Sequence, residues 1–170
     1  MASSPTLSLE FLTEEAYRPF GEVISPRDGL SLRSANQGTA QRFLDVAHLQ
    51  DLRPGRARPH LSIYRCDPRC APLPITVLER HAHATQLFVP LRDDARYLSV
   101  VAPPGPTPDL TAIRVFEVRG RTGITYHPGV WHHPLITLDQ VTDFLCLVWE
   151  DGTSGDCEEV SVIEGPILSW

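Results

Sequence analysis

Lysine is absent from this 170-residue chain, so all 15 of its basic side chains are arginines. Reactions that need a lysine, as a Schiff base with a carbonyl substrate or as a general base, are therefore excluded. Aspartate and glutamate together number 21, and the net charge of −6 gives no sign of a nucleic-acid-binding surface. A small anionic substrate would need a local cluster of arginines, because a guanidinium binds a carboxylate through two hydrogen bonds.

Long hydrophobic runs are also absent. No apolar stretch at the N-terminus resembles a signal peptide, and none approaches the length needed to cross a membrane. The four cysteines, Cys66, Cys70, Cys146 and Cys157, include no pair of CxxC-like motifs, which argues against a zinc ribbon. We therefore expect a cytoplasmic protein with reduced thiols and without a membrane or nucleic-acid partner.

Turn-forming residues, by contrast, are plentiful. The 11 glycines and 16 prolines are spread along the sequence, which favours many short elements over a few long helices. Hydrophobic residues make up 42% of the chain, as is ordinary for a globular protein, and no internal repeat or linker divides it. We predict a single domain over residues 1–170.

One short helix is predicted near the N-terminus, within residues 11–24. Thr13 is suited to cap it, and Glu14 suits the positive end of the helix dipole. Pro19 and Gly21 would end it early. Residues 25–41 are polar and rich in glycine and serine, and we expect a loop there.

Short β-rich runs dominate from about residue 60 onward. They are rich in Val, Ile, Leu, Tyr and Phe, and turn residues separate them. The runs are HLSIYRC (60–66), ITVLERH (75–81), QLFVPL (86–91), RYLSVVA (96–102), AIRVFEV (112–118), GITYH (123–127) and DFLCLVWE (143–150). The proline-rich stretch 103–109 is expected to be a surface loop. The pattern predicts an all-β fold, either a sandwich or a small barrel.

Three of the seven histidines lie in one ten-residue stretch, TYHPGVWHHP (125–134). The segment His127-Pro128-Gly129-Val130 matches a type II turn, so one strand should end near His127 and the next should begin at Trp131. Because side chains alternate along a strand, His132 and His133 face opposite ways and only one of them can enter the interior. Rim histidines bonded to backbone carbonyls are the alternative interpretation.

A second polar cluster lies in LERHAHATQLF (78–88). In a strand over 77–83, Glu79, His81 and His83 share one face, and Glu and His at alternate positions can supply two metal ligands. Gln86 lies beyond an expected kink. An ordinary polar strand at the mouth of a barrel is the alternative interpretation.

Together, these two stretches resemble the ureidoglycolate lyase family. The resemblance rests on the ordered motifs LERHxxxTQxFxPL and YHxxVWHHPLxxxxxVTDFL, and weaker similarity extends to nearly the whole chain. The motif positions are Leu78, Glu79, Arg80, His81, Thr85, Gln86, Phe88, Pro90, Tyr126, His127, Val130, Trp131, His132, His133, Pro134, Leu135, Val141, Thr142, Asp143, Phe144 and Leu145.

The resemblance implies a cupin fold, which is a double-stranded β-helix barrel, usually homodimeric, with its site inside the barrel. Aligned with the general cupin metal pattern, Glu79, His81 and Gln86 match its first part and His132 its second. These four are the predicted catalytic residues and the predicted ligands of a divalent metal ion, nickel or zinc. His83 departs from the family pattern, and His133 is left outside.

The resemblance also implies an activity, the cleavage of ureidoglycolate to glyoxylate and urea in allantoin and purine breakdown. This substrate carries a carboxylate, a hydroxyl and a ureido nitrogen on one carbon, and it collapses when the hydroxyl loses a proton and the C–N bond breaks. We expect His132 or a bound metal to assist that proton loss. Arg65, or else Arg42, should bind the carboxylate, and Tyr126 should bond a substrate oxygen.

Three other functions are compatible with the same residues. The chain could be a family relative that acts on another ureido or amido carboxylate, since the motifs do not define the pocket walls. It could be a non-catalytic cupin that binds a small ligand. A metal-dependent dioxygenase is a weaker alternative that would need His83 as an added ligand.

Overall fold

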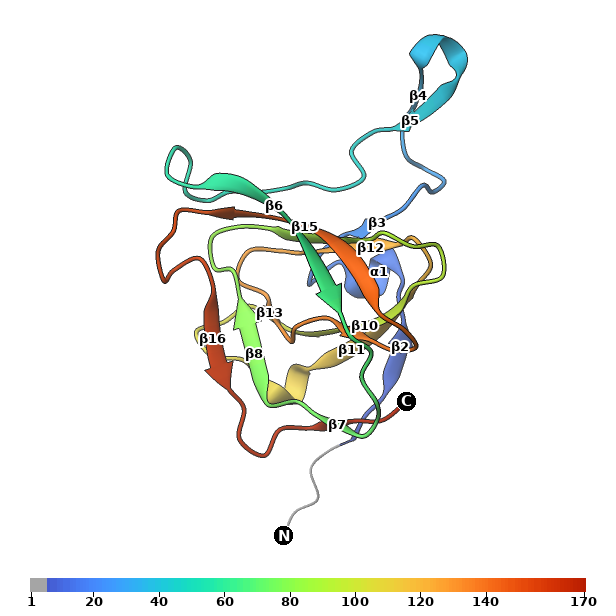
Figure 1. Cartoon of the computed structure of the whole chain (residues 1–170). Coiled ribbons are helices and arrows are strands. Elements are labelled where there is room, and N and C mark those ends of the chain that lie inside the picture. The colour runs from blue at the N-terminus through green and yellow to red at the C-terminus, as the bar shows by residue number, and fades with distance from the viewer. Residues whose placement is uncertain (1–5) are drawn as a thin grey trace.

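The computed structural model describes residues 6–170 and shows a nearly all-β protein with one short α-helix. This architecture confirms the predicted fold class, and two large sheets lie face to face as in a cupin-like sandwich (Figure 1). Each of the seven predicted β-rich runs contains an observed strand. Among the described residues, no helix is long and apolar enough to cross a membrane.

The larger sheet has seven strands in the order β16-β8-β13-β10-β11-β2, and β14 also pairs with β10. Its strands are β2 (Leu9–Phe11), β8 (Val77–Arg80), β10 (Arg96–Ala102), β11 (Arg114–Arg119), β13 (Trp131–His132), β14 (Ile136–Thr137) and β16 (Glu158–Ser161). The short strand β13 lies between β8 and β10, and this position places His132 beside Glu79 in register.

The second sheet has five strands in the order β3-β12-β9-β15-β6. They are β3 (Val23–Ile24), β6 (Arg58–Cys66), β9 (Gln86–Pro90), β12 (Gly123–Tyr126) and β15 (Thr142–Glu150). Neighbouring strands are antiparallel, with Phe144 opposite Tyr64 and Pro90. The two-residue period therefore turns Tyr64 and Phe144 to one face of this sheet and Leu61 and Ile63 to the other.

The hydrophobic core fills the space between the two sheets. Tyr97 and Val101 of the larger sheet are fully buried against Phe88 and Phe144 of the smaller one. The aromatic rings meet edge to face, with 5.0 Å between the centroids of Tyr97 and Phe144. Such contacts add to the free energy gained from burying apolar area.

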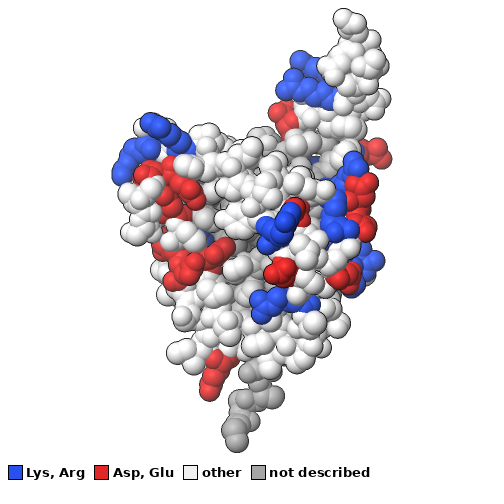
Figure 2. Space-filling view, viewed as in Figure 1, with Lys and Arg blue, Asp and Glu red and all other residues white. Residues whose placement is uncertain are grey.

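The outer faces of the two sheets differ in what covers them. On the larger sheet, Leu98 and Trp131 belong to a second buried cluster, closed by β1 (Thr6–Leu7), β7 (Leu73–Pro74) and β17 (Ile167–Leu168). On the smaller sheet, Leu61 and Ile63 are 66% and 56% exposed. Figure 2 shows an uncharged area over part of β6 and β15, bordered by charged groups. One apolar sheet face is therefore left open.

The short helix and the type II turn of the histidine-rich stretch were both predicted correctly. Helix α1 (Glu14–Tyr17) begins at the cap residue Thr13, whose side chain accepts a hydrogen bond from the Ala16 amide. The turn after β12 is closed by a 3.1 Å hydrogen bond from the Val130 amide to the His127 carbonyl, and Gly129 has the positive φ of 80° that a type II turn requires.

The predicted loop over residues 25–41 was wrong in part. This region contains β4 (Leu32–Ala35), the 3₁₀ turn η1 (Asn36–Gly38) and β5 (Ala40–Phe43), which form a separate two-stranded hairpin. Both strands are largely polar, so they lack the alternation of apolar residues by which a strand is recognised. Figure 1 shows the hairpin projecting away from both large sheets.

The proline-rich stretch 103–109 contains no strand and leads into the 3₁₀ turn η2 (Leu110–Ala112), in agreement with the expected loop. The prediction of a single cupin domain over residues 1–170 stays a prediction, because residues 1–5 lie outside the described part of the chain.

Candidate active site

A small pocket opens between the two sheets beside β6. Its lining includes Glu79, Phe88, Tyr126, His132 and Leu135, and it encloses about 80 Å³. That volume equals the share of two or three water molecules in the liquid. The pocket therefore suits a molecule of few atoms and not a polymer.

His132 lies at the bottom of this pocket and is 1% exposed. Its Nδ1 is 3.0 Å from the Val130 carbonyl oxygen, which can only accept, so Nδ1 carries a proton and donates it. The ring of Tyr126 stacks on the imidazole, with centroids 3.9 Å apart and planes 11° apart. These contacts fix the ring orientation and leave the Nε2 lone pair facing the pocket.

His81 follows the end of β8 and has the same arrangement. Its Nδ1 donates to the Asp156 carbonyl oxygen at 2.7 Å, and its Nε2 is buried without a hydrogen-bond partner. Burial is the main reason that the pKa of His81 lies below its usual value, and His132 lowers it further. His81 is therefore a neutral imidazole with a free Nε2 lone pair.

Glu79 completes the group from the opposite strand. Its Oε1 is 3.3 Å from Nε2 of His132, and the three residues Glu79, His81 and His132 offer ligand atoms that all lie within 4.8 Å of one another. Burial raises the pKa of Glu79, but His132 and His81 lower it by more, so the pKa of this carboxyl lies below its usual value. Glu79 is thus ionised at neutral pH.

Gln86 enters the interior from β9. It is 3% exposed, and it pairs in register with Tyr126, the residue that stacks on His132. Its Oε1 is buried without a hydrogen-bond partner. The structure therefore brings Glu79, His81 and His132 together and places Gln86 in the interior, paired with Tyr126.

Acceptor atoms predominate among these side chains. The ligand atoms of Glu79, His81 and His132 lie within 4.8 Å of one another, and both histidine Nε2 atoms and the Gln86 Oε1 are buried without a hydrogen-bond partner among residues 6–170. Buried polar atoms are otherwise almost always paired. A divalent cation would satisfy them, and metal-binding histidines commonly donate their other ring N–H to a backbone carbonyl, as both do here. The residues therefore fit the predicted metal.

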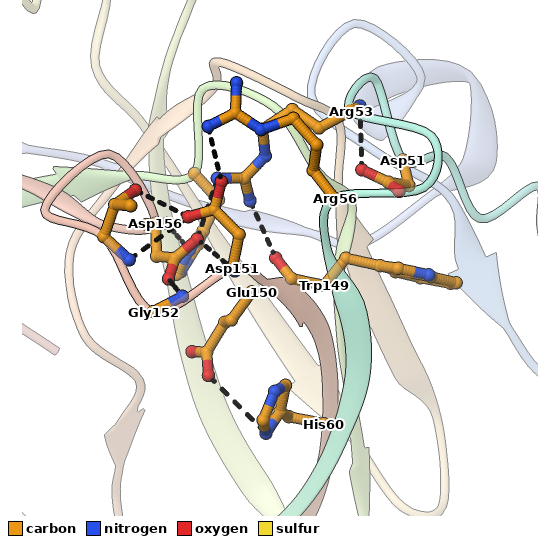
Figure 3. A network of polar contacts seen from close by, with 11 residues as sticks. Asp51, Arg53, Arg56, His60, Trp149, Glu150, Asp151, Gly152 and Asp156 are labelled. Carbon is orange, nitrogen blue, oxygen red and sulfur yellow. Dashed lines mark hydrogen bonds and ion pairs between the residues drawn. The ribbon is translucent and has the colours of Figure 1, made fainter.

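The loop over residues 151–157 holds the partner of His81 in place. Figure 3 shows Arg53 reaching into this loop, where its Nη1 is 2.8 Å from Asp156 and 3.1 Å from Asp151. The Asp156 carboxylate also accepts hydrogen bonds from the amides of Asp151 and Gly152. These bonds fix the backbone of Asp156, whose carbonyl oxygen orients His81.

The two predicted carboxylate-binding arginines do not lie at this pocket. Arg65 points to the outer face of the smaller sheet, where it forms two 2.8 Å hydrogen bonds with Asp143. Its neighbour Tyr64 lines the pocket instead, because alternate residues of β6 face opposite ways. Arg42 lies on β5 of the projecting hairpin, away from the barrel of its own chain.

Tyr126 lies in the pocket, but its hydroxyl is turned away from it. The ring forms a wall of the pocket, while the hydroxyl accepts a hydrogen bond from Ser99 in the core. The Ser99 hydroxyl is also hydrogen-bonded to the hydroxyl of Tyr17. Burial raises the pKa of Tyr126 well above its usual value. In this structure Tyr126 therefore contributes its ring face, by positioning His132, and not a hydrogen bond to a ligand.

The remaining histidines lie outside the cluster. His83 is exposed, so it does not join Glu79 and His81 despite sharing their parity in the sequence. His133 is turned the other way from His132, as alternation predicts, and its Nδ1 bonds the Pro134 carbonyl. With only two histidines in the cluster, the structure gives the dioxygenase alternative no further ligand.

Sequence reasoning missed several residues of the site. Tyr64 lines the pocket, and Cys157 and Glu159 approach Glu79 closely enough to form a second possible metal-binding group. Glu159 is opposite Glu79 on β16. The stretches SIYR (62–65) and DCEEV (156–160) were the available signals, since both belong to the weaker part of the family similarity.

This chain is similar in sequence to known proteins of one family. A protein-family model described as ureidoglycolate lyase matches residues 4–168. A ureidoglycolate lyase from Burkholderia cepacia is 44% identical over 161 residues, which are 94% of this chain and 88% of that protein. One from Pseudomonas fluorescens (strain SBW25) is 42% identical over 154 residues, 91% of this chain and 90% of that protein. One from Pseudomonas syringae pv. syringae is 41% identical over 162 residues, 95% and 93% of the two chains.

Proposed function

The chain belongs to the ureidoglycolate lyase family, and from this premise we propose that its pocket cleaves ureidoglycolate into glyoxylate and urea. The observation that carries the proposal is the buried group of Glu79, His81 and His132, whose ligand atoms lie within 4.8 Å of one another, with Glu79 and His132 lining one small pocket. The reaction moves one proton from a hydroxyl oxygen to a ureido nitrogen as the C–N bond breaks. A pocket rich in proton acceptors suits that transfer.

A divalent metal ion is part of this proposal. Glu79, His81 and His132 would hold it, and the buried Gln86, which pairs with Tyr126, would add an oxygen ligand or contact the substrate. Imidazole and carboxylate ligands suit nickel and zinc alike. When bound, the ion would supply a positive charge that lowers the pKa of the substrate hydroxyl.

The residues of the chain have further roles in the same reaction. The buried Gln86 Oε1 can accept a hydrogen bond from a ureido N–H, which fixes the leaving group. The walls formed by Phe88, Tyr126 and Leu135 exclude bulk water from the reacting carbon. Tyr126 holds the imidazole of His132 by stacking, so that its Nε2 points at the ligand.

Without an ion, His132 and Glu79 alone can carry the proton. The Nε2 of His132 would take the hydroxyl proton and return it to the ureido nitrogen, while the Glu79 carboxylate 3.3 Å away stabilises the imidazolium between the two steps. Electrons of the C–N bond leave with the nitrogen, and glyoxylate forms as the oxygen gains its double bond.

The direct test is turnover. Purified protein is mixed with racemic ureidoglycolate, and glyoxylate and urea are measured with and without a chelator. We expect both products in equal amounts, and chelation should abolish turnover if the metal route operates. A panel of other ureido and amido carboxylates serves as control, and faster release from one of those compounds would replace the proposed substrate.

We also propose that the protein is a homodimer. The open outer face of the smaller sheet, with Leu61 and Ile63, is the supporting surface. Apolar patches of this kind mark contact sites in proteins. Sedimentation analysis should give twice the chain mass, and Ile63→Arg should shift the equilibrium toward monomer. A monomer at micromolar concentration in the unaltered protein would contradict the proposal.

A cytoplasmic location is the last part of the proposal. All four cysteines are free thiols in the structure, and burial raises the pKa of Cys146 to about 12. Reduced thiols persist in the cytoplasm. Cell fractionation with an antibody against the chain tests this location.

A further inference from the structure

The pocket contains no strong cation for the carboxylate of an anionic ligand. Among its lining residues the ionisable side chains besides cysteine and tyrosine are Glu79 and His132, and Arg65 is bound to Asp143 on the outer face. The carboxyl side chains of Glu79 and Glu159, which lie close together, offer no positive charge to a substrate carboxylate. A cation held by the cluster would supply charge inside the pocket, but the rim of the pocket still needs a carboxylate-binding group.

The projecting hairpin carries two arginines with nothing to bind. Arg33 on β4 and Arg42 on β5 lie directly opposite each other in the register, and both are exposed. Neither forms an ion pair or a side-chain hydrogen bond with any residue between 6 and 170. Like charges opposite one another destabilise an antiparallel pair. Two guanidinium groups side by side are therefore a costly arrangement unless an anion or an acidic surface lies between them.

The hairpin also lacks a packing partner within its own chain. β4 and β5 pair only with each other, and Leu32 is 54% exposed. An isolated two-stranded hairpin is at best marginally stable in water. Figure 2 shows the basic groups gathered on this projection, well separated from the rest of the molecule. Such a segment gains its stability from a second surface.

The topology indicates where that surface lies. The hairpin follows β3, which is one edge of the smaller sheet, and the pocket opens at β6, which is the other edge. When two copies pack their open faces together around a twofold axis parallel to the strands, the β3 edge of one copy lies over the β6 edge of the other. Residues 25–31 add up to roughly 20 Å of extended chain, which is enough for the hairpin to reach from the β3 edge of its own copy to the pocket of the other copy.

We propose that Arg33 and Arg42 reach the second copy of the chain and bind the substrate carboxylate at the rim of its pocket. This inference rests on the proposed function and on the proposed dimer. The two guanidinium groups would bind the carboxylate oxygens as paired donors. The partner's Glu159, which is exposed, would meanwhile relieve the repulsion between the two arginines. Each active site would then be built from two chains.

The first test is kinetic. In protein already shown to release glyoxylate from ureidoglycolate, the double variant Arg33→Gln/Arg42→Gln should raise KM about 10- to 100-fold, because charged hydrogen bonds to the carboxylate are lost. The matched control is Arg121→Gln, an exposed arginine paired with Asp93 on the surface, which should leave KM and kcat unchanged. An unchanged KM in the double variant overturns the proposal.

The second test decides whether the arginines act across the dimer. Heterodimers are purified through two different tags, with His132→Ala in one chain and the double hairpin variant in the other. If the arginines act in the second copy, one site of each heterodimer has both its His132 and its arginines, and about half of the unaltered kcat returns with an unaltered KM. If they act within their own chain, the one site that keeps His132 lacks its arginines and retains the raised KM of the double variant, which overturns the proposal.

Assembly is controlled in the same experiment. The tagged heterodimer contains both chains by construction, so weaker association cannot imitate the loss of arginine. Failure of the proposed function would appear earlier and differently, as the absence of glyoxylate release by the unaltered protein. A protein that is active but strictly monomeric in sedimentation would also overturn this inference while leaving the proposed function intact.

Discussion

At the scale of single residues, the site is defined by which nitrogen of each histidine carries the proton. Backbone carbonyls of Val130 and Asp156 accept from Nδ1 of His132 and His81, and this fixes both lone pairs on Nε2. The carboxylate of Glu79 faces the same space. The arrangement is chemically specific because reversing either tautomer would place an N–H donor in the acceptor cluster.

Replacement of His132 gives the sharpest prediction at this scale. His132→Ala should lower kcat at least about a hundredfold, since general acid–base assistance is worth roughly 10²–10⁴. Circular dichroism should show an unchanged fold. His83→Ala is the control, because His83 is exposed and outside the cluster. Near-full activity of the His132 variant would exclude this histidine from the reaction.

Glu117 provides a prediction on pH and stability. Burial raises its pKa, but Arg119 and Arg96 lower it by more, so the folded-state pKa lies below the unfolded value. A carboxyl of this kind stabilises the fold above the unfolded pKa, and that stability is lost as the pH falls through the folded pKa. Both arginines are partly exposed, so solvent screening limits the effect to about 1 kcal/mol.

The measurement is urea unfolding of Glu117→Gln at several pH values. We expect the variant to have a lower urea midpoint than the unaltered chain at pH 7. The difference between the two midpoints should shrink below about pH 4, because Glu117 of the unaltered chain is then protonated when the chain unfolds. A constant difference across that range would show that loss of packing, and not of charge, explains the effect.

At the scale of elements, the loop over residues 151–157 acts as a support for His81. Arg53 binds two aspartates of this loop, and its Nη2 donates to the Trp149 carbonyl at 3.2 Å. The Arg53 side chain is 10% exposed, so few of these bonds can be replaced by water. Groups that orient a metal ligand from outside commonly matter almost as much as the ligand itself.

Arg53→Met should therefore lower kcat/KM about 10-fold, the range seen for outer partners of metal ligands. The loop should also become more sensitive to proteolysis. Limited digestion with a protease that cleaves after acidic residues would detect this. Arg121→Met, at an exposed ion pair, is the matched control and should behave as the unaltered chain. An ordered loop with normal activity in Arg53→Met would show that this ion-pair network does not support the site.

At the scale of the whole molecule, two sheets enclose both the core and the pocket. The aromatic contacts between Phe144, Tyr97 and Phe88 lie directly beside the pocket wall. The same packing thus stabilises the fold and shapes the site. Phe144 is fully buried, so no rearrangement at the surface can compensate for its loss.

Phe144→Ala should destabilise the fold by about 3–5 kcal/mol, the usual effect of deleting a buried aromatic ring. Chemical denaturation monitored by tryptophan fluorescence would measure it. Val141→Ala, at an exposed position near the start of the same strand, should change stability little. An effect below 1 kcal/mol for Phe144→Ala would mean that the core relaxes around the lost ring.

The sequence by itself determined seven of the strands, the helix cap and the type II turn. These features depend on neighbours along the chain, such as the alternation that separates His132 from His133 and the glycine that permits a positive φ at residue 129. The family motifs then predicted Glu79, His81, Gln86 and His132 as site residues, and the fold brings the first two and His132 within 4.8 Å of one another.

Only the tertiary structure decided the rest. The register of β6 with β15 decides which residues of β6 face the pocket, and it turns Arg65 away from it. The Tyr126 hydroxyl is engaged by Ser99, which is 27 residues away in the chain. The carbonyl that orients His81 comes from a loop 75 residues later in the chain. Contacts of this kind arise from strand register and loop closure between distant segments, and no local pattern of residue types encodes them.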